Sequence, residues 1–154
     1  MKKLDTIDKK LLRFLQLDSR INVKEIAAKL NLTKTPIYDR IKRFDREGII
    51  KKYVAVLDPR KIESSITVFC SVSLDNQKLN AIDEFREDVK NIREIVECYL
   101  MGGANDFLLK VIVTDLEAYH QFSSGKLAAL RNVSQIKSTF VLNEVKNSTV
   151  IPIY

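Results

Sequence analysis

Basic and hydroxyl-bearing side chains gather between residues 33 and 52, and their chemistry suits a polyanion. The set comprises Thr33, Lys34, Thr35, Tyr38, Asp39, Lys42, Arg43, Arg46, Lys51 and Lys52. Lysine and arginine neutralise phosphate groups, whereas hydroxyl and carboxylate groups can meet the edges of bases in a groove. The residue types therefore indicate contact with double-stranded DNA.

A helix over residues 34–46 would carry most of these side chains. Ile37, Ile41 and Phe44 recur at helical spacing on its opposite side and predict a buried stripe. Thr33 stands where an N-cap is expected, and Gly48 is placed to end the helix. The helix would therefore present its basic side to a ligand.

The position of each side chain along this helix suggests its role. The N-terminal part of a recognition helix usually reaches base edges, so Thr35, Tyr38, Asp39 and Lys42 are the candidates for reading sequence. The remaining members of the set are expected to contact phosphates, which position the helix without reading sequence.

Asp39 is unusual in this setting because phosphates repel a carboxylate. It could accept a hydrogen bond from a cytosine N4 amine, or it could pair with Lys42 or Arg43. We favour the pair within the chain. Arg40 flanks the buried stripe, and its aliphatic stem is expected to lie along that stripe.

Two further helices are predicted before this one. Asn22 and Glu25 form a potential capping box that opens a short helix, which breaks at Asn31. Asp5 or Thr6 can cap an earlier amphipathic helix. Two short helices joined by a tight turn, the second of them basic, are the form of a helix-turn-helix.

The charge of the chain changes at the end of this segment. Residues 49–57 alternate enough to predict a strand leading away, and residues 58–64 resemble a linker. Residues 1–62 hold 17 Lys and Arg against 8 Asp and Glu, a net charge of +9, whereas residues 63–154 carry −3. Binding to a polyanion is therefore expected of the first part only.

Composition excludes several classes of protein. The 154 residues are 45% hydrophobic and 30% charged, which indicates a globular chain. No apolar run approaches the roughly 20 residues that a membrane-spanning helix needs. The N-terminus becomes charged too soon for a signal peptide. We therefore expect a cytoplasmic protein without a membrane partner, in which Cys70 and Cys98 are reduced core residues.

The second part has a different periodicity and predicts a βαββαβ order. Its expected elements are strands at 66–74, 106–114 and 133–145, a segment at 92–101 that is partly or wholly a strand, helices at 79–92 and 116–130, and a short edge at 149–153. The second helix is expected to be interrupted or to end near Gly125. The fold class is thus α+β: an N-terminal three-helix winged helix-turn-helix domain over 1–62, and a C-terminal ferredoxin-like domain over 63–154 with both helices on one face.

Gly102 and Gly103 stand directly before Ala104, Asn105 and Asp106. They could simply form a hairpin turn with the glycines at positive φ. Alternatively, their backbone N–H groups could hold an α-carboxylate while Asp106 pairs with an α-ammonium group. The residues alone leave both interpretations open.

The sequence contains no group of residues at catalytic or metal-binding spacing. His120 is the single histidine and has no partner at metal-ligand spacing, and the two cysteines form no CxxC pair. Phosphate-binding loops and nucleophile elbows are also missing from the sequence. We therefore expect a protein that is not an enzyme and that needs no cofactor or metal.

The chain resembles the Lrp/AsnC, or leucine-responsive, family of transcription regulators over nearly its whole length. The resemblance is carried by LDTID, LTKTPIYDRIKRF and GIIKKYVAVLDP in the first part, and by YLMGGANDFLLKVIVTDLEAYHQF and STFVLNEVKNSTVIPI in the second. It implies a regulator of amino-acid metabolism whose effector domain dimerises through its sheets. It also implies that dimers assemble into tetramers or octamers and bind amino acids or related metabolites between them.

The resemblance supports the functional interpretation of the turn and suggests two further site residues. Gly103 and Asp106 fit the effector site of the family, although Ala104 and Asn105 replace a more usual acidic-aromatic pair. Lys137 and Thr139 match positions that line the same pocket. Asp39 beside Arg40 departs from the basic pair that the family tends to place there, so the operator sequence is not implied.

A second hypothesis is a metabolite-binding oligomeric module whose helical head does not bind DNA directly. The positive charge of residues 1–62 argues against it. The sequence therefore favours a sequence-specific DNA-binding regulator that responds to an amino acid or a related small metabolite.

Overall fold

The computed structural model describes residues 3–58, 61–62 and 65–154. The chain divides into two compact units, one made of residues 1–56 with 146–154 and the other of residues 57–145. Within the predicted linker, residues 59–60 and 63–64 lie outside the described residues. No helix in the described part of the chain is long and apolar enough to cross a membrane.

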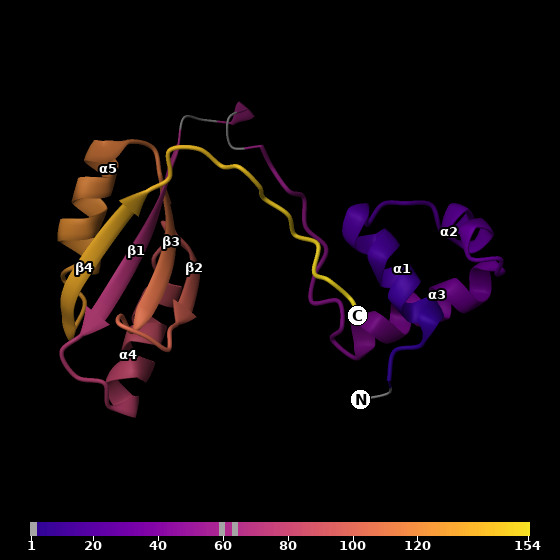
Figure 1. Cartoon of the computed structure of the whole chain (residues 1–154), viewed down its shortest axis with the longest axis horizontal. Helices are drawn as coiled ribbons and strands as arrows, with labels where there is room; N and C mark the ends of the chain where they lie inside the picture. The colour runs from indigo at the N-terminus through magenta and orange to yellow at the C-terminus, as the bar shows by residue number, and fades with distance from the viewer. Residues whose placement is uncertain (1–2, 59–60, 63–64) are drawn as a thin grey trace. The chain divides into compact units, whose positions relative to one another are not determined.

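The first unit contains the three predicted helices, α1 (Thr6–Leu17), α2 (Val23–Lys29) and α3 (Lys34–Arg46) (Figure 1). Each has one apolar side, and these sides meet in a small core. Leu11 of α1, Ile26 of α2, and Ile37 and Phe44 of α3 are fully buried there. The predicted stripe on α3 is therefore confirmed, and it sets which side of α3 remains exposed.

Residues in the left-handed conformation end α2 and α3. Asn31 has φ of 54° and follows α2, and Gly48 has φ of 67° and follows α3. After α3 the N–H of Gly48 donates to the carbonyl of Asp45, and that of Ile49 donates to the carbonyl of Phe44. This is the Schellman arrangement, so the predicted end of α3 at Gly48 is confirmed.

The helix caps differ in detail from the prediction. Asp5, rather than Thr6, caps α1, and it forms a full capping box with Asp8. Asn22 caps α2 by accepting from the N–H of Lys24, without the reciprocal bond from Glu25 that the predicted box requires. Thr33 occupies the N-cap position of α3 but its side chain makes no capping hydrogen bond.

The predicted strand after α3 is not formed. Residues 51–58 have no strand structure, and Val56 is 70% exposed. A strand needs a neighbour that completes its ladder of backbone hydrogen bonds, and no described segment pairs with these residues. Alternation of side chains alone was therefore a misleading signal here.

The C-terminal segment 146–154 also differs from the prediction, because it packs on α1 instead of adding an edge strand. Arg13 donates to the carbonyl of Ile153 at 2.7 Å. Gln16 donates to the carbonyl of Ile151 at 3.2 Å and accepts from its N–H at 2.6 Å. Ile153 also packs against the core of the helices. We call residues 146–154 the C-terminal clip.

The second unit has the predicted βαββαβ order. Its elements are β1 (Ile66–Leu74), α4 (Leu79–Lys90), β2 (Ile95–Leu100), β3 (Phe107–Val113), α5 (Leu116–Gln121), a π-helical segment (Phe122–Leu127) and β4 (Val133–Phe140). The strands form one antiparallel sheet in the order β2-β3-β1-β4. Gly125 lies in the π-helical segment, where the predicted interruption falls, and β4 ends five residues earlier than predicted.

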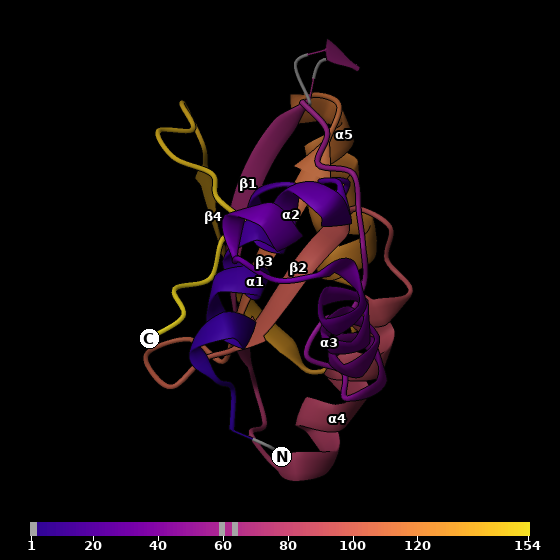
Figure 2. The same cartoon turned by 90° about the vertical axis from the view of Figure 1, so that its right-hand side faces the viewer.

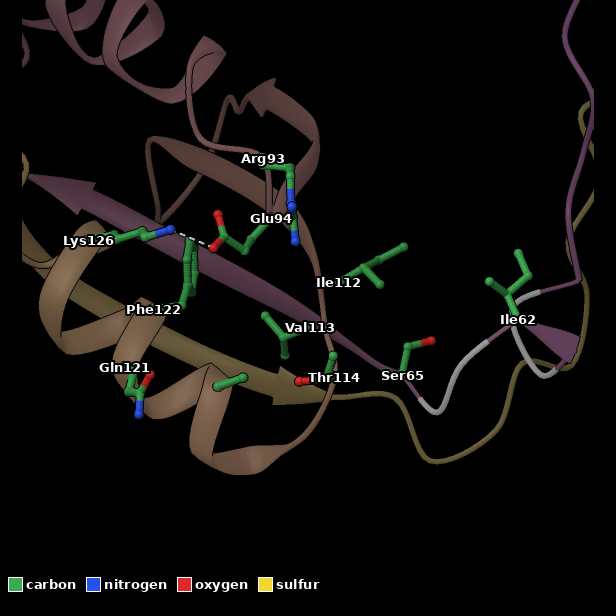
Figure 3. A pocket seen from close by; sticks show the side chains of 11 residues that line it. Ile62, Ser65, Arg93, Glu94, Ile112, Val113, Thr114, Gln121, Phe122 and Lys126 are labelled. Carbon is green, nitrogen blue, oxygen red and sulfur yellow. Dashed lines mark hydrogen bonds and ion pairs between the residues drawn. The ribbon is translucent and has the colours of Figure 1, made fainter.

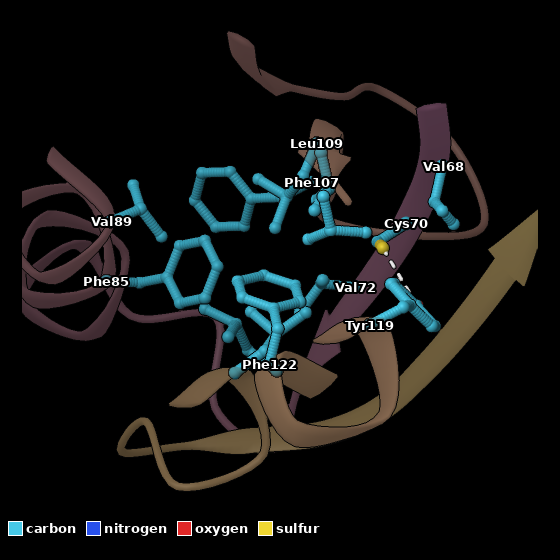
Figure 4. Close-up of a cluster of buried hydrophobic side chains, with 13 residues drawn as sticks. Val68, Cys70, Val72, Phe85, Val89, Phe107, Leu109, Tyr119 and Phe122 are labelled. Atoms are coloured by element: carbon cyan, nitrogen blue, oxygen red, sulfur yellow. Dashed lines mark hydrogen bonds between the residues drawn. The ribbon is translucent and has the colours of Figure 1, made fainter. Parts of the chain in front are cut away.

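The core of this unit lies between one face of the sheet and the helices that cover it (Figures 2 and 4). The rings of Phe85 on α4 and Phe107 on β3 have centroids 4.4 Å apart. Cys70 is buried, with its Sγ 3.2 Å from the hydroxyl of Tyr119. Cys98 is free and exposed, so the prediction of a core position is wrong for this cysteine.

Candidate DNA-contacting surface and effector turn

The exposed side of α3 carries most of the predicted DNA-contacting residues. Tyr38 is 51% exposed, although tyrosine is usually more buried. Thr35, Asp39, Lys42 and Arg46 are exposed beside it. Because the buried stripe holds the opposite side of α3, these side chains face solvent from a fixed helix.

A shallow hollow of about 480 Å³ lies along this side of α3. Its lining combines four cationic side chains with a single carboxylate and one proline. The residues are Pro36, Asp39, Arg40, Lys42, Arg43 and Arg46. A hollow with this excess of positive charge attracts anions such as phosphate groups.

Arg43 has a partner inside the chain. Its Nη2 atom lies 2.6 Å from Oδ2 of Asp8 on α1, and its side chain is only 19% exposed. Its guanidinium also lies over the ring of Phe44, 5.3 Å from the centroid. The predicted phosphate contact of Arg43 therefore competes with contacts that hold it against α1 and the core.

Arg40 also pairs with carboxylates of α1 and its N-cap, and these ion pairs were not predicted from the sequence. Its Nη1 atom lies 2.7 Å from Oδ2 of Asp5 and also contacts Oδ1 of Asp8. Asp8 is only 1% exposed. The signal available in the sequence was the capping box of Asp5 and Asp8, which places both carboxylates at the start of α1. We call Asp5, Asp8, Arg40 and Arg43 the Asp8 cluster.

Contacts within the Asp8 cluster shift the pKa values of Asp5, Asp8 and Arg40 in consistent directions. Burial opposes the charged form of Asp8, but hydrogen bonds from Arg43, the Asp5 backbone and Arg40 lower its pKa on balance. The hydrogen bond from the Asp8 backbone, followed by that from Arg40, lowers the pKa of Asp5. The hydrogen bond to Asp5 raises the pKa of Arg40 despite burial. Asp5, Asp8 and Arg40 are therefore charged at neutral pH, and the ion pairs of the cluster join α1 to α3.

Asp39 does not form the predicted pair with Lys42 or Arg43. Among the described residues it has no ion pair, and Arg43 is bound to Asp8 instead. The carboxylate of Asp39 is exposed in the lining of the α3 hollow. The alternative role of Asp39, as an acceptor from a base amine, thus agrees better with its position.

The remaining predicted DNA contacts flank α3. Thr33 and Lys34 are exposed at its N-terminal end. Lys51 and Lys52 are exposed in the segment that follows α3. Side chains at both ends of a recognition helix are well placed to contact the backbone of a duplex.

The residues proposed for the effector turn lie between β2 and β3. Neither Gly102 nor Gly103 has the predicted positive φ, and a Cβ atom built on either meets no atom within 4 Å. The turn therefore does not need glycine for its backbone conformation or to avoid contacts with its own chain. An approach by another molecule remains a reason for small residues there.

Asp106 anchors this turn to β1. Its Oδ2 atom accepts from the N–H of Leu74 at 2.8 Å, and its Oδ1 atom accepts from the amide of Gln77 at 2.8 Å. Its own N–H donates to the carbonyl of Val72 at 3.0 Å. The carboxylate that was expected to pair with an ammonium group already has partners within the unit.

The turn reaches the sheet face opposite the helices, which we call the open face. Asn105 accepts weakly from the hydroxyl of Ser73 on that face, at 3.4 Å. Lys137 pairs in register with Ser71, one open-face position along β1, and Thr139 pairs with Phe69, a further position away. The sheet thus brings Lys137 near the turn, with Thr139 more distant.

Two family models match the chain. The Lrp/AsnC ligand-binding domain covers residues 67–151, and a winged helix-turn-helix DNA-binding domain covers residues 4–51. The leucine-responsive regulatory protein of Escherichia coli (strain K12) is 35% identical over 147 residues, which is 96% of this chain and 90% of the relative. The leucine-responsive regulatory protein of Klebsiella pneumoniae is also 35% identical over 147 residues.

Solved structures agree along nearly the entire chain. A transcriptional regulator from Neisseria meningitidis in complex with L-methionine has a TM-score of 0.91 and 30% identity, and covers 97% of both chains. An AsnC family transcriptional regulator from Agrobacterium tumefaciens has a TM-score of 0.90 and 36% identity, also with 97% of both chains covered.

Proposed function

Because this chain belongs to the Lrp/AsnC family of DNA-binding transcription regulators, we propose that the exposed side of α3 reads its DNA sites and that an amino acid bound at the Gly102–Asp106 turn governs this binding. The chain is a regulator and not an enzyme. The observation that carries the proposal is the exposed, cationic side of a helix whose other side is fixed by a buried stripe.

In this proposal the residues of α3 divide into two groups. Thr35, Tyr38, Asp39 and Lys42 enter the major groove and meet base edges. Phosphate contacts come from Thr33, Lys34, Arg46, Lys51 and Lys52, which are exposed around them. Arg43 supplies positive potential near the groove while its guanidinium stays on Asp8.

We further propose that the chain forms a homodimer through the open face of its sheet, with residues 63–154 as the effector and oligomerisation domain. Tyr99 is 49% exposed on this face, and Phe69 and Leu108 lie beside it only partly buried. A cluster of exposed and half-buried apolar side chains on a sheet face favours contact with another protein surface of the same kind. The dimer would present two α3 helices to successive major grooves, and dimers would assemble further into tetramers or octamers.

The proposed effector is an amino acid. The relatives named for their response to leucine, and the relative solved with L-methionine, support this class of molecule. At the turn, Gly103 and Ala104 are exposed, so in this proposal their backbone N–H groups bind the α-carboxylate, and Asn105 offers a polar side chain. Asp106 holds the turn in place, and Lys137 and Thr139 border it from β4. Such a regulator acts in the cytoplasm, where its amino-acid effector and its DNA are found together.

The double variant Lys42→Ala/Arg46→Ala tests the DNA-contacting surface. Both side chains are exposed and free of ion pairs with described residues, so their removal should leave the fold intact. We expect binding to selected genomic fragments to weaken roughly tenfold or more. The slope of the salt dependence should fall by about one for each phosphate that the variant no longer neutralises.

Lys78→Ala/Arg131→Ala is the matched control, because it removes the same charge from exposed positions of the second unit. Fluorescence anisotropy at several salt concentrations gives both affinity and slope. Equal losses in the two double variants would show a general effect of net charge and would reject the α3 surface.

A further inference from the structure

The second unit contains a cavity of about 440 Å³ at the end of the sheet where β2 begins and β3 ends. This volume lies within the range of about 300–1,000 Å³ that is usual for small-molecule sites. The seven residues of β3 separate it from the Gly102–Asp106 turn by roughly 20 Å. The cavity is therefore distinct from the effector turn.

The lining of this cavity has an apolar part and a charged part. The apolar part includes Val113 at the end of β3, Ala118 on α5 and Phe122 in the π-helical segment, together with Ile62 and Ile112. Arg93, Glu94 and Lys126 form the charged part (Figure 3). A site with this division suits a molecule that has an apolar group and a charged end.

Glu94 has one satisfied and one unsatisfied carboxylate oxygen. Its Oε1 atom accepts from Nζ of Lys126 at 2.6 Å. Its Oε2 atom is buried and has no hydrogen-bond partner among the described residues. Buried polar atoms are nearly always paired in folded proteins, so this oxygen is a vacant acceptor for a donor group.

A cationic side chain lies on each side of this carboxylate, and among the described residues only Lys126 forms an ion pair with it. Figure 3 shows Lys126 and Arg93 on either side of Glu94. Arg93 forms no ion pair with any residue that the structure describes. A planar guanidinium is well suited to bind a carboxylate through two hydrogen bonds.

We propose that this cavity is a second ligand site, which binds an α-amino acid with an apolar side chain. The ligand ammonium donates to Oε2 of Glu94, the ligand carboxylate pairs with Arg93, and the side chain packs on Phe122 and Val113. This assignment depends on the cavity alone and not on the proposed function of the effector turn.

Methyl-detected NMR of the full chain tests the proposal through the methyl signals of Val113. We expect them to shift on titration with at least one of L-leucine, L-methionine and L-phenylalanine. Glu94→Gln keeps the shape of the side chain and an acceptor for Lys126 but removes the charge. It should raise the Kd measured at Val113 by at least about tenfold. Glu84→Gln, at an exposed position of α4, is the matched control.

Two analogues of leucine separate the two ends of the ligand. N-acetyl-L-leucine lacks the ammonium group and should not shift Val113. The amine 3-methylbutylamine lacks the carboxylate, so it should bind more weakly than leucine and should be insensitive to Arg93→Gln. The same Arg93→Gln substitution should weaken the binding of leucine at this cavity.

The outcomes that overturn the proposal are clear. The site is rejected if none of the three amino acids moves Val113, or if Glu94→Gln and Glu84→Gln titrate alike. Gly103→Val distinguishes this site from the effector turn, because its Cβ is tolerated by the chain while it obstructs an approaching ligand. Loss of the Val113 shifts in that variant would mean that the cavity only reports binding at the turn.

Discussion

The two units of this chain achieve their stability in different ways. Among its described residues, the second unit has thirteen buried ones in one apolar core between a sheet and its helices. The first unit has six buried apolar residues among those described, and beside them a buried carboxylate with two arginines. The effector unit therefore depends mainly on packing, whereas the DNA-binding unit also depends on charge and on the C-terminal clip.

This difference bears on how the regulator works. Arg40 and Arg43 belong both to the Asp8 cluster and to the cationic hollow of α3. The same side chains thus position the recognition helix and contribute to the potential that attracts DNA. Changes in the charges of the Asp8 cluster should affect the folding and the DNA binding of the first unit together, and should spare the second unit.

Removal of the carboxylate in Asp8→Ala should have the largest effect. It leaves Arg40 and Arg43 without a buried partner, and breaking a buried ion pair costs about 3–5 kcal/mol. We expect a separate, early unfolding transition of the first unit, seen by calorimetry and by amide exchange in α1 and α3. Asp39→Ala removes an exposed carboxylate and should change stability by less than about 0.5 kcal/mol. A single transition unchanged from the parent would show that the cluster does not stabilise the unit.

Acid should reproduce part of this loss. The pKa values of Asp5 and Asp8 are lowered in the folded chain, so their stabilisation is complete above the unfolded value near 3.8 and is lost as the pH falls through the lower folded values. Amide exchange followed from about pH 6 down through the lowered folded pKa values should show that α1 opens as the carboxylates are protonated. In Asp8→Asn this dependence should be smaller. A dependence that remains unchanged in Asp8→Asn would assign the acid sensitivity to other carboxyl groups.

Shortening the side chain of Ile153 in the C-terminal clip, by Ile153→Ala, should have a smaller effect. Ile153 is only partly buried against the core of the first unit, so the loss should be about 1–2 kcal/mol, below the 2–5 kcal/mol of a fully buried site. Amide exchange in α1 should accelerate while that of β1 and β3 stays constant. Tyr154→Ala, at a position that is 97% exposed, is the control. Equal behaviour of the two variants would mean that the clip contributes no packing.

Local patterns predicted most of the fold. The stripe of Ile37 and Phe44, the stop at Gly48 and the strand at 66–74 each depend on residues that are close in sequence. The prediction of a strand after α3 was wrong because a strand also needs a neighbouring strand for its backbone hydrogen bonds. Alternation of side chains does not supply one. The backbone angles of Gly102 and Gly103 likewise could not be predicted from the residue type, because glycine permits positive φ without requiring it.

The candidate site was predictable in outline and not in its supporting contacts. The exposed side of α3 followed from helical periodicity. The pairs of Arg40 and Arg43 with Asp8 join residues more than 30 positions apart, and the bonds of the clip to α1 join residues 135 and 140 positions apart. Such contacts arise from tertiary packing, which no local window of sequence contains.

The C-terminal clip also has a consequence for folding during synthesis of the chain. Residues 146–154 leave the ribosome after every residue of the effector unit, yet they complete the unit that is synthesised first. Domains generally fold in the order of their synthesis, at about 5–20 residues per second. Here the three helices emerge early, but residues 146–154, which pack on α1, emerge only after the second unit has been synthesised. A nascent chain thus completes its DNA-binding unit only after residues 57–145 have been synthesised, and a chain released before residue 146 would lack the contacts that secure α1.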